Sequence, residues 1–314
     1  MEARYVGIDV SKDRLDVHVL PEGAAFAVGR DGKGLAELVE RMGTMSPERI
    51  AVEATGGFET VVAAALAGAS LPVVVVNPAP AQVRHFAQAL GRRAKTDPID
   101  ASMIARFVEA TKPDLRELPD AATQLLADLV ARRRQIIEMI VAERNREKRV
   151  AVMRIRKSIA RLIAALEKEL SEIDGEIDAS VRGSPAWREK EDLLASVPGV
   201  GPITARTLIA ELPELGTLDG KRIASLAGLA PFTRQSGQWK GKAMIAGGRK
   251  SVRSALFLAS LVACRHNPIL KAFRQRLLDA GKPKMLVAIA AARKLLTILN
   301  AILRDKQPWS PETA

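Results

Sequence analysis

The chain is poor in cysteine, histidine and aromatic residues, and each shortage excludes a kind of site. The one cysteine, Cys264, cannot form an intramolecular disulfide or a zinc cluster of several thiolates, and we expect it to be an inert packing residue. The three histidines, His18, His85 and His266, lie far apart in the sequence, which argues against a histidine metal site. Aromatic residues make up only 4% of the chain, so a binding surface built on aromatic stacking is a poor fit.

The sequence also lacks signals for a membrane or for export. No uninterrupted apolar run approaches the roughly 18 residues that a membrane-spanning helix needs. The N-terminal segment MEARYVGIDVSK is charged and then strand-like, without the apolar core of a signal peptide. We therefore expect a cytoplasmic protein with no membrane partner.

What the sequence does contain is enough apolar material for a folded core and an uneven distribution of charge. Hydrophobic residues make up 47% of the 314 positions. At roughly 150 residues per domain, this length predicts about two domains. The net charge of +12 is concentrated near the C-terminus, since residues 1–110 carry −2, residues 111–192 carry +1 and residues 193–314 carry +13. This asymmetry predicts that the C-terminal part binds a polyanion.

The first part of the chain, residues 1–118, alternates the patterns of strands and helices. Three strand patterns, the first over Tyr5–Val10, come before a helix, and a further strand and helix follow. The continuous apolar run Val73–Val76 is typical of a strand buried on both faces. Two more helices are expected near residues 79–90 and 98–110. The predicted order βββαβαβα belongs to the α/β class and is the order of the ribonuclease H-like fold.

The remaining sequence predicts a helical segment and then a basic, mostly helical domain. Over residues 119–192 apolar residues recur at spacings of three and four. This seam fits two long helices or one interrupted helix, paired with another chain as a coiled-coil dimerisation segment or with itself as a hairpin. In residues 193–306 the segment PGVGPITA separates two helical patterns, as in a helix-hairpin-helix motif. Residues 307–314 have the composition of a frayed tail.

Four carboxylates stand where the predicted first domain has no structural need for them. Asp9 lies inside an apolar strand, and Glu53 ends another strand. If these strands are neighbours, both side chains point to one spot beyond the carboxyl ends of the strands, where open α/β sheets place their sites. Asp97 and Asp100 are three residues apart at the start of a predicted helix and share one face of it. Such oxygen ligands suit Mg²⁺, although Asp97 could be a helix cap and Asp9 and Glu53 could be solvated strand residues.

The basic domain carries three groups of candidate nucleic-acid contacts. Glycines in PGVGPITA allow backbone N–H groups to approach a phosphate, although a glycine cap between packed helices has the same pattern. The cations of GGRKSVR fit phosphate clamps, or else a solvated helix face. The loop TRQSGQWKGK places a serine among cations that would stabilise an attacking alkoxide, although a serine beside glycine usually serves a turn. The candidate contacts are Gly199, Gly201, Arg234, Lys240, Lys242, Arg249, Lys250 and Arg253, and the candidate nucleophile is Ser236.

Two sets of motifs resemble one known family. VGIDVSK, VEATGG and KTDPIDA resemble the DEDD, RuvC-like domain of IS110 family insertion-sequence transposases. PGVGPITA, LAGLAP, RQSG and GGRKSVRSAL resemble the C-terminal transposase domain of the same family. The motifs occur in the family's order from about residue 5 to about residue 265, with a coiled segment between the two sets. One departure is Gly248-Arg249, where many relatives have Gly-Asn before the arginine motif, and this leaves the role of that turn open.

The resemblance implies a DNA recombinase that inserts and excises a mobile element. It places the DEDD carboxylates, with Mg²⁺, on Asp9, Glu53, Asp97 and Asp100, and a serine that forms a 5′-phosphoserine link to DNA on Ser236. It further implies a noncoding bridge RNA as a guide, whose loops pair with target and donor DNA. In a homodimer or homotetramer the serine of one subunit would complete the metal site of another. If base pairing reads the sequence, the protein needs contacts to the nucleic-acid backbone, which the basic segment can supply.

Two other functions fit parts of the sequence. A RuvC-like structure-selective nuclease that cuts with metal-activated water would use the same carboxylates, but the RQSG loop and the basic domain would then lack a role. A nonenzymatic nucleic-acid-binding protein would use only the hairpin motif and the helical seam. An actin-like sugar kinase is excluded, because it needs glycine-rich phosphate loops after its first strand and VSKDRLD has none.

Overall fold

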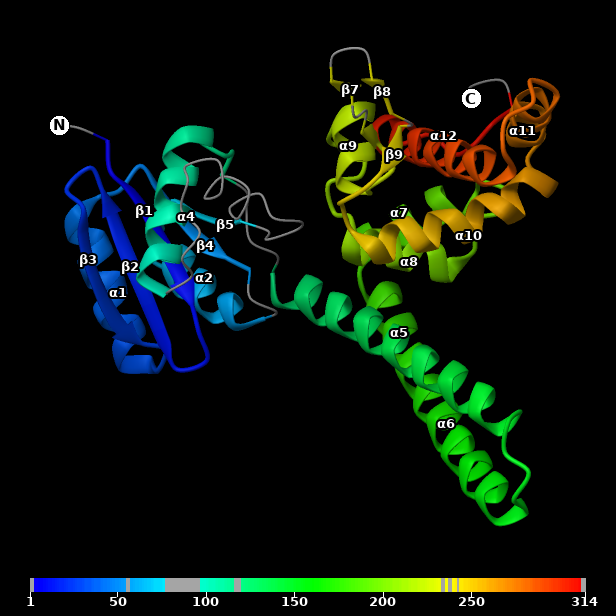
Figure 1. Ribbon diagram of the computed structural model, residues 1–314, viewed down its shortest axis with the longest axis horizontal. Coiled ribbons are helices and arrows are strands. Elements are labelled where there is room, and N and C mark those ends of the chain that lie inside the picture. The colour runs from blue at the N-terminus through cyan, green and yellow to red at the C-terminus, as the bar shows by residue number, and fades with distance from the viewer. Residues whose placement is uncertain are drawn as a thin grey trace. The chain divides into compact units, whose positions relative to one another are not determined.

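The chain folds into two compact units, Met1–Leu118 and Pro119–Ala314, which are described separately (Figure 1). The predicted helical segment 119–192 and the predicted basic domain 193–306 belong to the same unit. The computed structural model describes residues 3–54, 57–76, 97–115, 120–232, 235–236, 239–241 and 243–311. The helix expected near residues 79–90 lies outside the described residues.

The N-terminal unit is built on a five-stranded sheet in the order β3-β2-β1-β4-β5. The first three strands form an antiparallel meander, while β4 and β5 run parallel to β1. The strands are β1 (Tyr5–Val10), β2 (Arg14–Leu20), β3 (Ala24–Gly29), β4 (Arg49–Glu53) and β5 (Val73–Val76). This mixed sheet confirms the predicted α/β class and is compatible with the predicted RuvC-like fold.

Helices cover both faces of this sheet, as the alternation of side chains along the strands requires. On one face Val6, Ile8 and Val10 of β1 pack against α1 and α2, and on the other face Tyr5 packs against α4. The helices are α1 (Gly32–Met45), α2 (Phe58–Gly68) and α4 (Asp97–Thr111). Each strand therefore has one set of side chains under α1 and α2 and the alternate set under α4.

The outermost described strand, β5, differs from its predicted environment. The run Val73–Val76 predicts burial on both faces, but Val75 is 37% exposed. Val73 belongs to the core under α1 and α2, whereas Val74 and Val76 belong to the core under α4. The prediction of a strand buried on both faces is therefore wrong at Val75, because α2 covers only the start of this edge strand.

Gly7 allows α4 to lie directly on β1. A Cβ atom added at Gly7 would overlap backbone atoms of Ala101 and Ala105. These atoms cannot move alone, because the hydrogen bonds of α4 hold them in the helix. The absence of a side chain at Gly7 thus sets the separation between β1 and the helix that carries Asp97 and Asp100.

Replacing Gly7 with alanine is expected to destabilise the N-terminal unit by about 1–3 kcal/mol, because the added methyl group pushes α4 away from the sheet. The matched control is Gly43→Ala on α1, where an added Cβ meets nothing within 4 Å and helix propensity favours alanine. Hydrogen exchange of the β1 amides measures the local stability. Equal protection in the two variants would contradict the tight contact.

The C-terminal unit is helical, and its first two helices pair with each other. These are α5 (Ala121–Glu147) and α6 (Met153–Gly183). Arg144 pairs with Glu167 at 2.6 Å and Arg133 pairs with Asp174 at 2.5 Å, so residue numbers fall along one helix as they rise along the other. Of the alternatives left open by the sequence, the structure therefore has two helices in an antiparallel hairpin within one chain. Pairing with a second chain stays a prediction.

The described remainder of the unit has six helices and four two-residue strands, and of these α7 contacts α6 and α8 contacts α5. Apolar residues of α5 and α6 share one hydrophobic core with the helices that follow. The helices are α7 (Pro185–Ala195), α8 (Pro202–Glu211), α9 (Gly220–Leu226), α10 (Lys250–His266), α11 (Pro268–Asp279) and α12 (Lys284–Asp305). The strands are β6 (Pro231–Phe232), β7 (Gln235–Ser236), β8 (Trp239–Lys240) and β9 (Met244–Ile245).

By length and composition alone, one described helix, α12, is long and apolar enough to cross a membrane. Half of its most apolar stretch is buried inside the unit, and Leu295 and Leu299 lie fully in the core. Arg293 and Lys294 interrupt the apolar run in the sequence, which is why no continuous stretch stood out there. The burial of α12 is that of a core helix.

Candidate active site

The sheet brings Asp9 and Glu53 side by side. β1 and β4 are parallel neighbours with Gly7 opposite Ala51 and Ile8 opposite Val52, so the next step along both strands sets Asp9 beside Glu53. Alternation along β4 puts Glu53 on the same face as Ala51, which packs in the core under α4. Asp9 lies on that face too, two residues after Gly7. The two carboxylates thus share one face at the carboxyl ends of two parallel strands.

The direction of α4 brings its first turn to the same end of the sheet. Near the end of α4, Lys112 lies over the ring of Tyr5 at the start of β1, and Arg49 at the start of β4 donates to the carbonyl of Pro113. Further along β1, Gly7 lies against Ala101, which is close to the start of α4. The helix therefore runs opposite to β1, and Asp100 lies in the turn that approaches the Asp9 end of the strand.

The donors of this carboxylate group suit a hard divalent cation, because all of them are oxygens. Asp9, Glu53 and Asp100 come from three elements that converge on one end of the sheet, and each is partly buried. The side chain of Asp97 is outside the described part of the structure. Within the described part, no three His, Cys, Asp or Glu side chains are close enough to form a ready-made metal group.

Sequence reasoning missed a further carboxylate, Asp16. It lies directly opposite Asp9 across the antiparallel β1–β2 pair and therefore on the same face. Asp16 is only 4% exposed, and Arg14 donates to its Oδ1 at 2.6 Å. The alternating polar positions of RLDVHVL carry the signal, but they look like a solvent-facing strand until α4 is known to cover them. Asp16, Asp9 and Glu53 form a row across three strands, with Arg14 as a nearby cation.

His18 continues the same face of β2, opposite Gly7. Burial lowers the pKa of His18 below its usual value, and the positive charge of Arg106 on α4 lowers it further. A lowered pKa keeps the imidazole neutral near pH 7. Arg14 and Arg106, and not His18, therefore supply positive charge to this face.

In the C-terminal unit, Ser236 lies in the inner of two nested hairpins. β6 pairs with β9, and between them β7 pairs with β8 so that Ser236 is opposite Trp239. Figure 1 shows β7 and β8 at the outer end of this element. Lys240 lies on β8, and the side chains of Ser236 and Lys240 lie outside the described part of the structure. Arg234 and Lys242 lie outside the described residues.

The turn between α7 and α8 gives its two candidate glycines different surroundings. Gly199 has a φ of +101°, and an added Cβ would overlap Ala263 of α10. Gly199 is thus required for helix packing, whatever else it contacts. Gly201 is the exposed N-cap of α8, and an added Cβ there would meet nothing within 4 Å. Contact of this turn with a phosphate stays a prediction, and the exposed Gly201 suits it better.

The three cations at the start of α10 also differ. Arg249 makes a two-pronged ion pair with Glu214, at 2.5 and 2.7 Å, and donates to the carbonyl of Glu211. Arg253 donates to the carbonyl of Gly247. Both guanidinium groups therefore hold the protein's own turns together, which gives a physical reason for arginine after Gly248. Lys250 is exposed, and its side chain forms no hydrogen bond or ion pair with any residue that the structure describes.

Known proteins similar to this chain match it over nearly its whole length. A DEDD-type transposase profile matches residues 6–152, and the profile described as "Transposase IS116/IS110/IS902 family" matches residues 191–275. The pilin gene-inverting protein of Moraxella bovis is 29% identical over 98% of both chains. A 42 kDa protein of insertion element IS900 from Mycobacterium paratuberculosis is 31% identical over 49% of this chain and 40% of its own length. A 43.6 kDa protein of insertion element IS110 from Streptomyces coelicolor is 29% identical over 47% of this chain and 36% of its own length.

Proposed function

Since the chain belongs to the IS110 family of transposases, we propose that it is a Mg²⁺-dependent DNA recombinase of an insertion sequence that uses Ser236 as its nucleophile. The family implies a DNA-cleaving recombinase. The observation that carries the proposal is the placement of Asp9 beside Glu53 at the end of β1 and β4, where the first turn of α4 brings Asp100. The name of the Moraxella bovis relative describes the inversion of a gene, a process in which DNA strands are cut and rejoined.

In this proposal Asp9, Glu53, Asp97 and Asp100 hold the divalent cation, which when bound would withdraw charge from the phosphate that is attacked. The chain's own groups keep the four carboxylates in place. Gly7 fixes the distance of α4 from β1, and Arg14 offsets part of the negative charge by pairing with Asp16. Asp16 is thus a positioning residue beside Asp9.

The proposed chemistry conserves the number of phosphodiester bonds. The Ser236 hydroxyl loses its proton and attacks phosphorus, so that a serine O–P bond forms while the P–O3′ bond breaks. The departing 3′ oxygen takes up a proton, and the 5′ phosphate stays on the serine. A 3′ hydroxyl from another strand then attacks the same phosphorus and releases the serine. Nearby cations lower the energy of the charged pentavalent state.

Binding of the nucleic-acid partners is assigned to the basic C-terminal unit. We propose that it contacts the backbone of DNA and of a noncoding bridge RNA, with Gly201 and Lys250 among the contacts, while base pairing reads the sequence. We further propose that the protein acts in the cytoplasm as a homodimer or homotetramer through the α5–α6 hairpin. A serine from one subunit would then complete the metal site of another.

Expression of the chain together with its native flanking DNA tests whether a noncoding RNA guides the protein. Sequencing of the RNA that co-purifies is expected to yield one structured RNA from the noncoding end of the element. The control is the same chain expressed without the flanking DNA, which should yield no such RNA. A folded, DNA-binding protein that carries no specific RNA in either preparation would mean that the protein itself recognises its site.

A further inference from the structure

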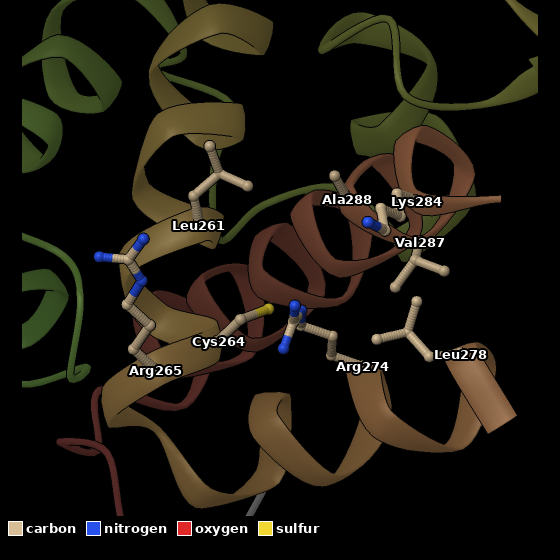
Figure 2. A pocket seen from close by; sticks show the side chains of 8 residues that line it. All are labelled: Leu261, Cys264, Arg265, Arg274, Leu278, Lys284, Val287 and Ala288. Carbon is tan, nitrogen blue, oxygen red and sulfur yellow. The ribbon is translucent and has the colours of Figure 1, made fainter.

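A cavity of about 250 Å³ lies between α10, α11 and α12, away from the hairpin that carries Ser236. Its apolar wall is formed by Leu261, Leu278, Val287 and Ala288 (Figure 2). Leu261 is 42% exposed, so part of this wall faces solvent. None of these four residues belongs to the candidate active site.

Three cations line the same cavity, Arg265 on α10, Arg274 on α11 and Lys284 on α12, and none of the described carboxylates does. Figure 2 shows Arg274 reaching from α11 toward Cys264, and the same arginine partly offsets the rise in the pKa of Cys264 that burial causes. No hydrogen bond or ion pair joins the side chain of any of the three cations to another described residue.

Several other arginines of this unit do have carboxylate partners. Arg133 pairs with Asp174, Arg206 with Asp178 and Glu191, and Arg249 with Glu214. From Lys250 to Lys284 the sequence contains eight lysines and arginines and a single acidic residue, Asp279. The cations of the cavity thus lie in a segment with almost no internal counter-charge, which favours an external anion.

The combination of an apolar wall and a cationic rim selects the chemistry of the ligand. A nucleotide has a flat base that can be buried against aliphatic side chains and a phosphate that pairs with arginine and lysine. The cavity is smaller than typical pockets for drug-sized ligands, so it fits one unpaired base but no duplex. A guanidinium plane can stack on a base, which removes the need for the aromatic residues that this chain lacks.

We propose that this cavity binds one unpaired nucleotide of a nucleic-acid strand, with the base against Leu278, Val287 and Ala288 and the backbone phosphates on Arg274, Lys284 and Arg265. The proposal rests on the function proposed above, because strand exchange and pairing with a guide both leave nucleotides unpaired. Either a DNA or an RNA strand can supply the nucleotide, since both offer the same base and phosphate.

The test uses the full chain without Mg²⁺, at one fixed salt concentration, and fluorescence anisotropy of labelled thymidine and uridine homopolymers. The double variant Arg274→Gln/Lys284→Gln is expected to bind single strands about tenfold more weakly than the control Lys271→Gln/Arg276→Gln. The control removes the same charge from α11 outside the cavity, so non-specific electrostatic losses cancel in the comparison. A larger loss for thymidine would indicate DNA as the source, and a larger loss for uridine would indicate RNA.

A second variant tests whether the space inside the cavity matters independently of its positive charge. Ala288→Phe fills the space without changing the net charge and is expected to weaken binding of single strands but not of duplex DNA. In the wild-type protein, abasic strands should bind as weakly as intact strands bind to Ala288→Phe. Equal losses in the two double variants, or unchanged single-strand binding by a folded Ala288→Phe protein, would overturn the proposal. All of these assays measure binding without Mg²⁺ and require no cleavage, so failure of the proposed catalytic function would leave this result unaffected.

Discussion

Asp9→Asn is expected to abolish divalent-metal-dependent DNA cleavage while the protein stays folded. The substitution keeps the shape of the side chain but removes one negative charge from the carboxylates that we propose hold the cation, which lie at one end of the sheet. A bound metal contributes several kcal/mol to transition-state stabilisation, so its loss corresponds to a rate decrease of about a thousandfold. Repulsion from Asp16 and Glu53 also decreases, and the metal-free fold should therefore tolerate the change.

Calorimetric titration with Mg²⁺ measures the loss of metal affinity, and a cleavage assay on the same preparation measures the loss of activity. The matched control is Asp13→Asn, an exposed aspartate in the turn that joins β1 to β2, which should leave both unchanged. Normal cleavage and metal affinity in Asp9→Asn would remove Asp9 from the site. If the wild-type protein itself binds no divalent cation, the nonenzymatic nucleic-acid-binding function would be favoured.

Ser236→Ala is expected to abolish covalent protein–DNA adducts and strand exchange, while metal binding and noncovalent DNA binding persist. The change removes the proposed nucleophile and leaves the carboxylates of the other unit untouched. Loss of a nucleophilic serine in other enzymes lowers the rate by factors of up to about a million, so a decrease of at least about a thousandfold is expected here. Denaturing gels of labelled DNA detect the adduct, and mass spectrometry locates the modified serine.

Ser251→Ala provides the control, because Ser251 lies in the first turn of α10 within the same basic region. Adducts that persist in Ser236→Ala would exclude this serine. Cleavage by the wild-type protein without any adduct would favour a RuvC-like nuclease that uses metal-activated water. Mixing Asp9→Asn with Ser236→Ala protein extends the test, since recovery of recombination requires that one subunit supplies the serine and another the metal site.

The sequence was most informative where local chemistry decides the structure. The alternation of apolar residues set the strands and helices of the N-terminal unit, and carboxylates inside apolar strands stood out because burial of a lone charge is costly. The motifs then indicated the family, which the comparisons establish. The roles of Asp9, Glu53, Asp97, Asp100 and Ser236 stay predictions that the experiments above address.

Pairings between residues distant in the sequence could not be predicted. Arg249 and Lys250 are adjacent cations, yet only Arg249 meets Glu214, because the turn after α8 folds back onto the start of α10. Asp16 had the pattern of a solvent-facing strand residue until α4 was seen to cover that face of β2. Composition gave the charge of these residues, but only packing showed which charges already have a partner.

By itself, then, the sequence determined the α/β class of the first unit, the helical and basic character of the second and the family, since these follow from periodicity, composition and motif order. Only the tertiary structure decided that β1 and β4 are neighbours, that α4 runs opposite to β1, and that Asp16 joins the row of carboxylates. Only the tertiary structure showed that Arg265, Arg274 and Lys284 line one cavity between α10, α11 and α12. The physical reason is that each of these features depends on contacts between segments whose separation in the chain leaves no local signal.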